Sequence, residues 1–416
     1  MRKTKSLDIS KQLVFNAFKK VKANRGSAGV DGQEIKDFGN RLKDNLYKIW
    51  NRMSSGTYFP KPVLRVEIPK SDGRMRPLGI PTLTDRIAQM TAKMVLEPSL
   101  ESVFHRDSYG YRPGKSAEQA IRITRQRCWR FDWVIDLDIK GFFDNLDHDL
   151  LMKAVVRHSQ VRWTILYIER WLKAPVQWQD GTQVNPLKGT PQGGVISPLL
   201  ANLFLHYAFD MWMNREFPSN PFARYADDVV VHCRTQAEAE HLKEKITARM
   251  RECNLELHPE KTKIVYCKDD NRKGDYHHTQ FDFLGFTFRS RTAKSRSGTL
   301  FNGFNPAVSM KSRKAFSNKL KSFRIQRRSD LNIFEISRLI NPLLRGWWNY
   351  FGCVYESETY CVMKQFNLIL YRWGRRKYKR LRSRKAFFRW IKRLVVRFPD
   401  LFVHWRIKWL GVMTIQ

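Results

Sequence analysis

Two adjacent carboxylates, Asp227 and Asp228, end the tetrapeptide Tyr-Ala-Asp-Asp at residues 225–228, which runs directly into three valines at 229–231. A short apolar run of β-branched residues is typical of a buried strand. Buried carboxylates need a cationic partner, and Mg²⁺ prefers a few carboxylates together with the phosphates of a substrate. The pair therefore points to a divalent metal site, with a solvated turn as the alternative for the pair taken alone.

A third carboxylate, Asp138, ends another apolar stretch, Trp-Val-Ile-Asp-Leu-Asp at residues 133–138. If the two strands lie side by side in one sheet, Asp138 joins Asp227 and Asp228, and three carboxylates can hold the paired divalent ions of phosphoryl transfer, about 3.5–4 Å apart. Asp136 shares the strand face of Asp138, so a supporting part for it stays open. We expect Asp144 to cap the helix that follows.

Charge indicates the class of partner. The 416 residues include 76 Lys and Arg against 39 Asp and Glu, a net charge of +37, which favours a polyanion such as nucleic acid. No stretch approaches the roughly 20 apolar residues of a membrane span, and the N-terminus lacks the apolar core of a secretory signal. The six cysteines form no C-x-x-C pair, which argues against a disulfide framework and a structural zinc site. We expect a soluble intracellular protein.

Periodicity places the elements that must position these acids. Residues 1–60 are predicted to be helical, with Leu13, Phe15, Phe18 and Val21 on one face, and interrupted by a glycine-rich turn at 26–32. Residues 63–80 predict a β-hairpin that turns at residues 72 and 73. A Gly-Thr-Pro-Gln-Gly-Gly loop opens the segment 189–212, which continues as a long apolar helix, and residues 281–288 are predicted to form one strand.

The C-terminal part of the chain carries most of the charge. A polar, turn-rich stretch at 289–305 predicts a domain boundary, and from residue 289 onward there are 30 Lys and Arg against 5 Asp and Glu. Six of the 13 tryptophans lie there as well, and arginines interleaved with flat aromatic rings suit phosphate contacts combined with base stacking. These six are Trp347, Trp348, Trp373, Trp390, Trp405 and Trp409.

The order of these segments resembles that of a reverse transcriptase, and more closely that of the intron-encoded protein of a bacterial group II intron. The segments that carry the resemblance run from about residue 20 to residue 350. They are NRGSAGVDG (24–32), RPLGIP (76–81), SYGYRPG (108–114), DLDIKGFFD (136–144), GTPQGG (189–194), YADD (225–228), FLGF (283–286) and NPLLRGWWNY (341–350).

The resemblance implies an α+β fold of the right-hand polymerase type, with fingers, palm and thumb, an antiparallel palm sheet and a helical, basic thumb or maturase domain. It implies an N-terminal extension at 1–60, fingers and palm at 61–288, a thumb or maturase domain at 289–375 and a basic DNA-binding tail at 376–416. Many members of the family end in an endonuclease with paired cysteines and histidines; we expect this small form to lack it.

The resemblance also assigns roles to residues. Asp138, Asp227 and Asp228 would be catalytic and bind two Mg²⁺ ions, and Lys261 would be a further basic residue near them. The incoming dNTP would be bound by Lys70, Arg76, Ile139 (through its carbonyl), Phe143 (as the steric gate against a ribose 2′-hydroxyl) and Gln192. Leu284 and Gly285 would form the primer grip. Nucleic acid would contact Arg345, Trp347, Arg375, Arg376, Lys377 and Arg380.

The implied function is that of an RNA-directed DNA polymerase and maturase. It would bind its group II intron RNA, assist splicing and copy the intron at a DNA target by target-primed reverse transcription. The implied setting is a cytoplasmic, nucleoid-associated ribonucleoprotein, with no membrane and no obligate protein partner. Two alternatives remain: a splicing-only, RNA-binding maturase, and a host-adapted reverse transcriptase of defence or repair without a resident intron.

Overall fold

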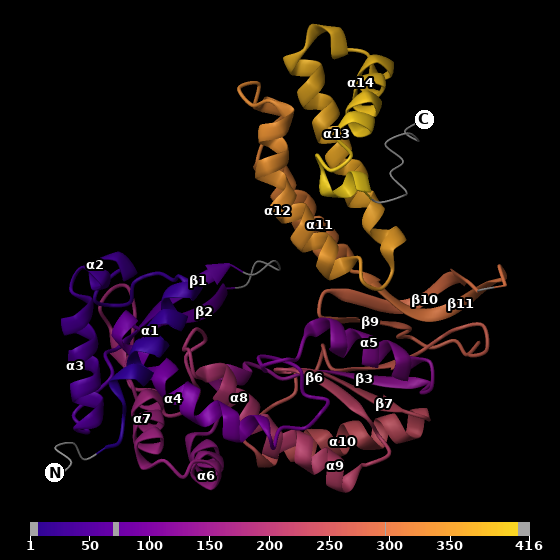
Figure 1. Ribbon diagram of the computed structural model, residues 1–416. Helices are drawn as coiled ribbons and strands as arrows, with labels where there is room; N and C mark the ends of the chain where they lie inside the picture. The colour runs from indigo at the N-terminus through magenta and orange to yellow at the C-terminus, as the bar shows by residue number, and fades with distance from the viewer. Residues whose placement is uncertain (1–6, 70–74, 296, 407–416) are drawn as a thin grey trace. The chain divides into compact units, whose positions relative to one another are not determined.

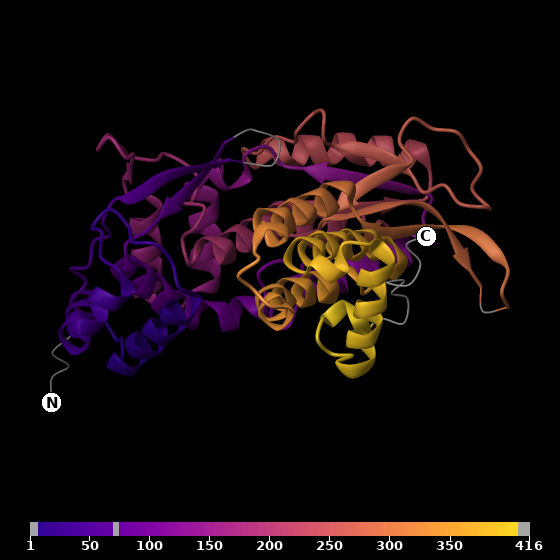
Figure 2. The same ribbon diagram turned by 90° about the horizontal axis from the view of Figure 1, so that it is seen from above.

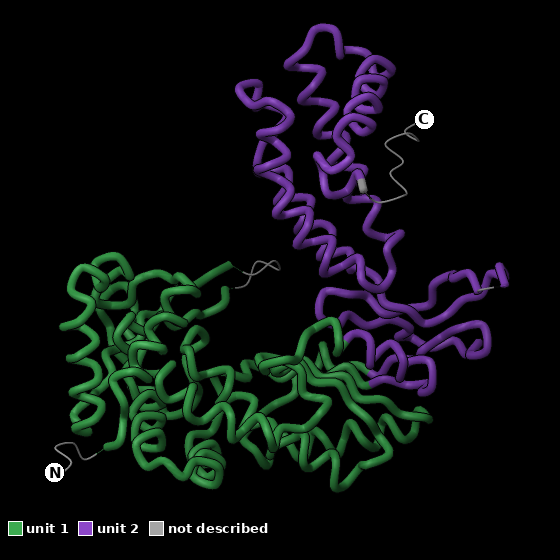
Figure 3. The backbone as a smooth tube through the Cα atoms, viewed as in Figure 1, with its two compact units in different colours: residues 1–120, 135–263 green, residues 121–134, 264–416 purple. Residues whose placement is uncertain are grey.

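The computed structural model describes residues 7–69, 75–295 and 297–406, and its backbone divides into two compact units (Figure 3). The first unit comprises residues 1–120 and 135–263, and the second comprises residues 121–134 and 264–416. Both units combine helices with strands, so the expected mixed α and β class is confirmed. No helix among the described residues is long and apolar enough to cross a membrane.

The first unit opens with the helices that the sequence predicts. In α1, the Oγ of Ser10 accepts a hydrogen bond from the N–H of Leu13 and caps the helix. The buried face of α1 includes Phe18 and Val21 as expected, whereas Leu13 and Phe15 are only half-buried. The helices of this part are α1 (Lys11–Asn24), α2 (Ile35–Asn40), α3 (Leu42–Ser54) and α4 (Leu83–Glu101).

The predicted hairpin at 63–80 is confirmed as strands β1 (Val63–Pro69) and β2 (Met75–Ile80), which pair antiparallel from Leu64↔Ile80 to Pro69↔Met75. The expected turn and Lys70 lie outside the described residues. Two short strands extend this sheet to the order β2-β1-β4-β5; they are β4 (Val176–Gln177) and β5 (Gln183–Val184).

A second sheet, in the order β6-β7-β3-β8, carries the acidic motifs. Helices α9 and α10 lie along one of its faces (Figure 1), and α10 begins with a capping box between Thr235 and Glu238. The strands are β6 (Phe222–Tyr225), β7 (Asp228–Cys233), β3 (Trp133–Asp138) and β8 (Lys263–Tyr266), and the helices are α9 (Met211–Glu216) and α10 (Gln236–Glu252).

Two details of the helices in the first unit differ from expectation. Asp147, not Asp144, caps α6, because its Oδ1 accepts the N–H of Leu150 at 2.8 Å; Asp144 belongs to a 3₁₀ turn three residues earlier. The long apolar helix at 189–212 is interrupted by a π-helical turn, His206–Asp210, between α8 and α9. Three further helices of this region are α6 (His148–His158), α7 (Arg162–Leu172) and α8 (Ser197–Leu205).

The second unit contains a three-stranded sheet in the order β11-β10-β9. The segment predicted as one strand at 281–288 is a hairpin, because Leu284 and Gly285 form a two-residue turn with φ of 50° and 81°. Within the turn-rich stretch at 289–305, residues 289–294 and 300–305 belong to two paired strands. The elements are α5 (Ala117–Cys128), β9 (Gln280–Phe283), β10 (Phe286–Lys294) and β11 (Leu300–Val308).

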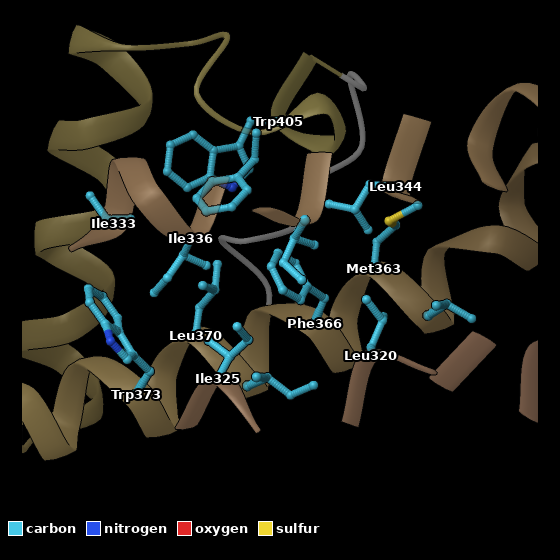
Figure 4. Packing of buried hydrophobic residues seen from close by; sticks show 14 of the residues in the cluster. Leu320, Ile325, Ile333, Ile336, Leu344, Met363, Phe366, Leu370, Trp373 and Trp405 are labelled. Carbon is cyan, nitrogen blue, oxygen red and sulfur yellow. The ribbon is translucent and has the colours of Figure 1, made fainter. Parts of the chain in front are cut away.

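Four helices complete the second unit and run side by side in both views (Figures 1 and 2). Their apolar side chains share one core, in which Phe366, Leu370 and Trp373 of α13 face Ile336 and Leu344 of α12 (Figure 4). The helices are α11 (Met310–Ser322), α12 (Ile333–Phe351), α13 (Tyr360–Lys377) and α14 (Arg384–Arg397).

The predicted tail at 376–416 begins inside a helix, and its residues 407–416 lie outside the described residues. Residue 376 lies within α13, and Phe387, Ile391, Phe402 and Trp405 belong to the same hydrophobic core as Trp373. Apolar residues spaced along α14 bury one face of that helix, which leaves its basic residues on the other faces.

The core of the second unit predicts a contrast within one helix. Leu370 of α13 is 1% exposed and Leu368 is 37% exposed, so the same substitution should differ in cost only through burial. Leu370→Ala should lower the free energy of unfolding by about 2–5 kcal/mol, and Leu368→Ala by less than about 1 kcal/mol. Urea titration with hydrogen exchange of the α13 amides measures both, and equal losses would contradict this packing.

Candidate active site

The Tyr-Ala-Asp-Asp motif forms the turn of the β6–β7 hairpin. Tyr225 and Asp228 are paired across the two strands, and Ala226 and Asp227 make the two-residue connection between them. Ala226 has φ of 58°, a left-handed conformation that residues with a β-carbon rarely adopt. The strands thereby present both carboxylates at one end of the sheet.

Asp138 ends β3, the strand next to β7 in the sheet. Burial raises the pKa of Asp227, and the negative charge of Asp138 raises it further, so the two carboxylates lie within electrostatic range. The charged form of Asp227 is therefore unfavourable unless a cation joins the pair.

Lys261 supplies a cation to Asp138. Its Nζ donates hydrogen bonds to both carboxylate oxygens of Asp138, at 3.0 and 3.2 Å. The segment that carries Lys261 is fixed by the N–H of His258, which donates to the carbonyl of Asp138 at 2.7 Å. Both partners of the ion pair are about two-fifths exposed, at 43% for Lys261 and 41% for Asp138, so solvent or another cation can compete for the carboxylate.

The donor set suits a hard divalent cation, because carboxylate and carbonyl oxygens are the ligands that Mg²⁺ prefers. Within the described ranges, no three or more carboxylate, histidine or cysteine side chains gather closely enough to enclose a metal.

The backbone of Ile139 is fixed by the segment around Leu257. Ile139 forms an antiparallel bridge with Leu257, and the flanking hydrogen bonds run from Lys140 N–H to Glu256 O and from His258 N–H to Asp138 O. In a bridge of this kind, the two opposed residues form no hydrogen bond with each other, and their backbone N–H and C=O groups point away from the partner segment. The carbonyl of Ile139 therefore points away from the segment around Leu257.

Phe143 anchors the Gly-Thr-Pro-Gln-Gly-Gly loop. Its ring is buried, and its carbonyl accepts the N–H of Thr190 at 2.7 Å. Gly189 has φ of 88°, and a β-carbon there would lie 2.8 Å from the carbonyl oxygen of Asp144, so only glycine fits this approach. The loop is thus fixed against the turn that follows Asp138.

The same loop is joined to the β1–β2 hairpin. The Nε of Arg76 donates to the Oε1 of Gln192 at 2.8 Å, and the N–H of Gly79 donates to the carbonyl of Gln192. A β-carbon on Gly193 would lie 2.4 Å from the carbonyl oxygen of Gly79. Two residues expected to bind the same ligand, Arg76 and Gln192, therefore lie in direct contact.

The expected primer grip, Leu284 and Gly285, is the β9–β10 turn of the second unit. The hydroxyl of Tyr350 donates to the carbonyl of Leu284 at 2.9 Å, and the hydroxyl of Ser312 donates to the carbonyl of Gly285 at 3.0 Å. The turn is therefore supported by α12 and α11, which fix the positive φ of Leu284, a strained value for a residue with a β-carbon.

Three of the C-terminal tryptophans, for which the sequence favours stacking on bases, have buried side chains. Trp347, Trp373 and Trp405 are at most 7% exposed and belong to the core of the second unit, where Trp347 stacks on Phe316. Trp409 lies outside the described residues.

The basic candidates of the second unit fall into two groups. The ammonium group of Lys377 donates to the carbonyl of Leu331 at 2.7 Å, so this side chain has a structural partner. The exposed residues, which remain available to a ligand, are Arg345, Arg375, Arg376 and Arg380.

Several residues that support the acidic turn gave no clear signal in the sequence. A β-carbon on Gly110 would lie 2.4 Å from the backbone nitrogen of Ala226, and Arg224, Asp210 and Asn202 form a buried network below the same turn. The sequence offered one signal: Arg224 is a charged residue inside the apolar run Phe-Ala-Arg-Tyr at 222–225. A charged residue in a buried strand needs hydrogen-bond partners, which Asp210 and Asn202 supply.

Comparison with known protein families identifies two regions. Residues 68–288 match the family model described as "Reverse transcriptase (RNA-dependent DNA polymerase)". Residues 313–393 match the model described as "Group II intron, maturase-specific domain".

Curated relatives include intron-encoded proteins. The chain is similar to protein YkfC of Escherichia coli, at 36% identity over 281 residues, which covers 58% of this chain and 73% of YkfC. It is similar to the group II intron-encoded protein LtrA of Lactococcus lactis, at 34% identity over 47% of this chain and 32% of LtrA. The match to LtrA thus spans about a third of that protein.

The close packing below the acidic turn predicts a cost for one added methyl group. Gly110→Ala should lower the free energy of unfolding by about 1–3 kcal/mol, because its β-carbon overlaps the backbone at Ala226. Gly39→Ala in α2 is the matched control, since nothing lies within 4 Å of its β-carbon. Urea titration measures both variants; a Gly110→Ala protein as stable as Gly39→Ala would contradict the packing.

Proposed function

The chain belongs to the reverse transcriptases, in the group II intron branch that carries a maturase-specific domain, and on this premise we propose that it copies RNA into DNA at the site of Asp138, Asp227 and Asp228. The observation that carries the proposal is that Asp138 ends β3, the neighbour of β7, while Asp227 lies in the turn before β7. Burial raises the pKa of Asp227, and the charge of Asp138 raises it further. A site that disfavours its own charge is suited to a bound cation.

Asp138, Asp227, Asp228 and the carbonyl of Ile139 would hold two Mg²⁺ ions. When bound, such ions lower the pKa of the primer 3′-hydroxyl and neutralise the leaving pyrophosphate. The carboxylates orient the primer terminus and the triphosphate for an in-line displacement. Lys261 holds the carboxylate of Asp138 in place until a competing cation enters.

The loop at 189–194 and the β1–β2 hairpin would form the nucleotide pocket. Arg76 offers a fixed guanidinium to the triphosphate, and Gln192, hydrogen-bonded to it, orients that guanidinium and meets the sugar or base. Phe143 closes the pocket where a ribose 2′-hydroxyl would lie. Because Phe143 also fixes Thr190, the gate and the nucleotide loop are positioned together.

In the terms of a right-hand polymerase, the β1–β2 hairpin and its neighbours would be the fingers, the β6-β7-β3-β8 sheet the palm, and helices α11–α13 the thumb. Exposed arginines of α12 and α13, with the segment that follows them, would bind the phosphates of folded intron RNA and of a DNA target. The protein would then assist splicing of its intron and copy it by target-primed reverse transcription, as a ribonucleoprotein.

Removal of the catalytic carboxylates tests this proposal. Asp227→Asn and Asp228→Asn, singly or together, should lower the rate of primer extension on an RNA template with dNTPs and Mg²⁺ by about 100-fold or more. Asp275→Asn, whose side chain is 96% exposed in the native protein, should extend at the native rate. Full extension by the Asp227→Asn, Asp228→Asn double variant would refute the site.

The steric gate predicts a change in sugar selection. Phe143→Ala should raise incorporation of ribonucleotides relative to deoxynucleotides by about 10- to 100-fold, because the 2′-hydroxyl gains space. Phe142→Ala is the matched control, since Phe142 is also a buried neighbour in the same turn but is assigned no gate role. The ratio of ribonucleotide to deoxynucleotide incorporation does not depend on the fraction of the variant that is folded. If both variants discriminate between the two sugars as the native protein does, the gate lies elsewhere.

A further inference from the structure

A fully buried ion pair lies directly below the acidic turn. The side chains of Arg224 in β6 and Asp210 in the π-helical turn are both 0% exposed. The Nε of Arg224 donates to one carboxylate oxygen of Asp210 at 2.7 Å, and Nη2 donates to the other at 2.5 Å. Bidentate geometry of this kind fixes the plane of the guanidinium as well as its position.

The stability of the folded protein is a weak explanation for a buried ion pair between Arg224 and Asp210. Transfer of two charges out of water is costly, and apolar residues of similar volume are often as stabilising as a buried ion pair. The pair also depends on the π-helical turn His206–Asp210, a distortion that appears frequently at functional sites. The remaining contacts of Arg224 therefore need an explanation.

Those contacts reach the acidic turn. The Nη1 of Arg224 donates to the carbonyl of Ala226 at 3.0 Å and to the Oδ1 of Asn202 at 2.9 Å. Asn202 in turn donates from Nδ2 to the carbonyl of Gly110 at 2.6 Å, the residue packed against Ala226 N. One guanidinium thus joins α8, the segment at 108–110 and the turn that carries Asp227.

The turn needs an external support because its first residue is strained. Ala226 has φ of 58°, and a residue with a β-carbon keeps such a conformation only where its surroundings determine it. The hydrogen bond from Arg224 holds the carbonyl of Ala226, and that carbonyl belongs to the peptide group that continues into Asp227. Rotation of this peptide would move the carboxylate of Asp227.

We propose that Arg224 is a positioning residue of the polymerase: Asp210 and Asn202 fix its guanidinium, which holds the peptide after Ala226 so that Asp227 and Asp228 face Asp138. The inference rests on the proposed function for its catalytic consequence. The structural part of the inference, that Arg224 supports the turn, does not depend on the proposed function.

The first experiment separates support of the turn from stability. A double variant, Arg224→Met with Asp210→Leu, replaces the ion pair by apolar side chains of similar shape. Its unfolding midpoint in urea should stay close to that of the native protein, while the rate of single-nucleotide addition falls roughly 10- to 100-fold. The dissociation constant of the primer–template should not change, because the network contacts the turn rather than an exposed surface.

The second experiment reads the turn directly and does not require the double variant to fold. Arg224→Lys keeps the charge but loses the fork that reaches both Asp210 and Ala226, so amide hydrogens of residues 225–228 should exchange faster. Arg291→Lys is the matched control: Arg291 is 6% exposed and bonded to Glu358 in the second unit, and its variant should leave this exchange and the addition rate unchanged.

The outcomes decide the inference in each case. Faster exchange at 225–228 with slower addition in Arg224→Lys supports the positioning role. Native exchange together with native addition rates in Arg224→Lys, or in a folded double variant, overturns it. If the native protein adds no nucleotide at all, the proposed function fails, and the exchange experiment still tests whether Arg224 holds the turn.

Discussion

Repulsion between carboxylates gathered at the end of one sheet is the constraint on which the site depends. Burial and the charge of Asp138 both disfavour the ionised form of Asp227, so the fold must hold these groups where they would otherwise separate. It does so through rigid surroundings: β3 and β7 are neighbours in the sheet, and Lys261 neutralises Asp138. Under the proposed function, a further cation would offset the repulsion that remains.

Backbone-to-backbone approaches hold the parts of the site together. Gly189 lies against the turn of Phe143, and Gly193 lies against the carbonyl of Gly79, so the loop at 189–194 connects the acidic sheet to the β1–β2 hairpin. Each approach has no room for a β-carbon. The glycines of the loop therefore allow close packing between the loop, the turn of Phe143 and the β1–β2 hairpin. The hydrogen bond from Arg76 to Gln192 also joins the hairpin to the loop.

The sequence predicted what local pattern controls, and missed what tertiary packing controls. Short apolar runs located the strand that ends at Asp138 and the strand that begins at Asp228. The alternation of residues 281–288 runs unbroken through a two-residue turn, so the hairpin at Leu284 was predicted as one strand. Arginine-rich helices suggested exposed tryptophans, yet Trp347 lies in the core, because composition does not say which face of a helix is covered. Nothing local marks the π-helical turn that places Asp210.

The most direct test of the central claim is anomalous diffraction from crystals of the protein with an RNA–DNA primer–template, a non-reactive dNTP analogue and Mn²⁺ in place of Mg²⁺. The account predicts two Mn²⁺ peaks bound by Asp138, Asp227 and Asp228, with the Lys261 ammonium displaced from Asp138. A properly bound dNTP with no Mn²⁺ at these three carboxylates, or with Mn²⁺ bound by other residues, would contradict it.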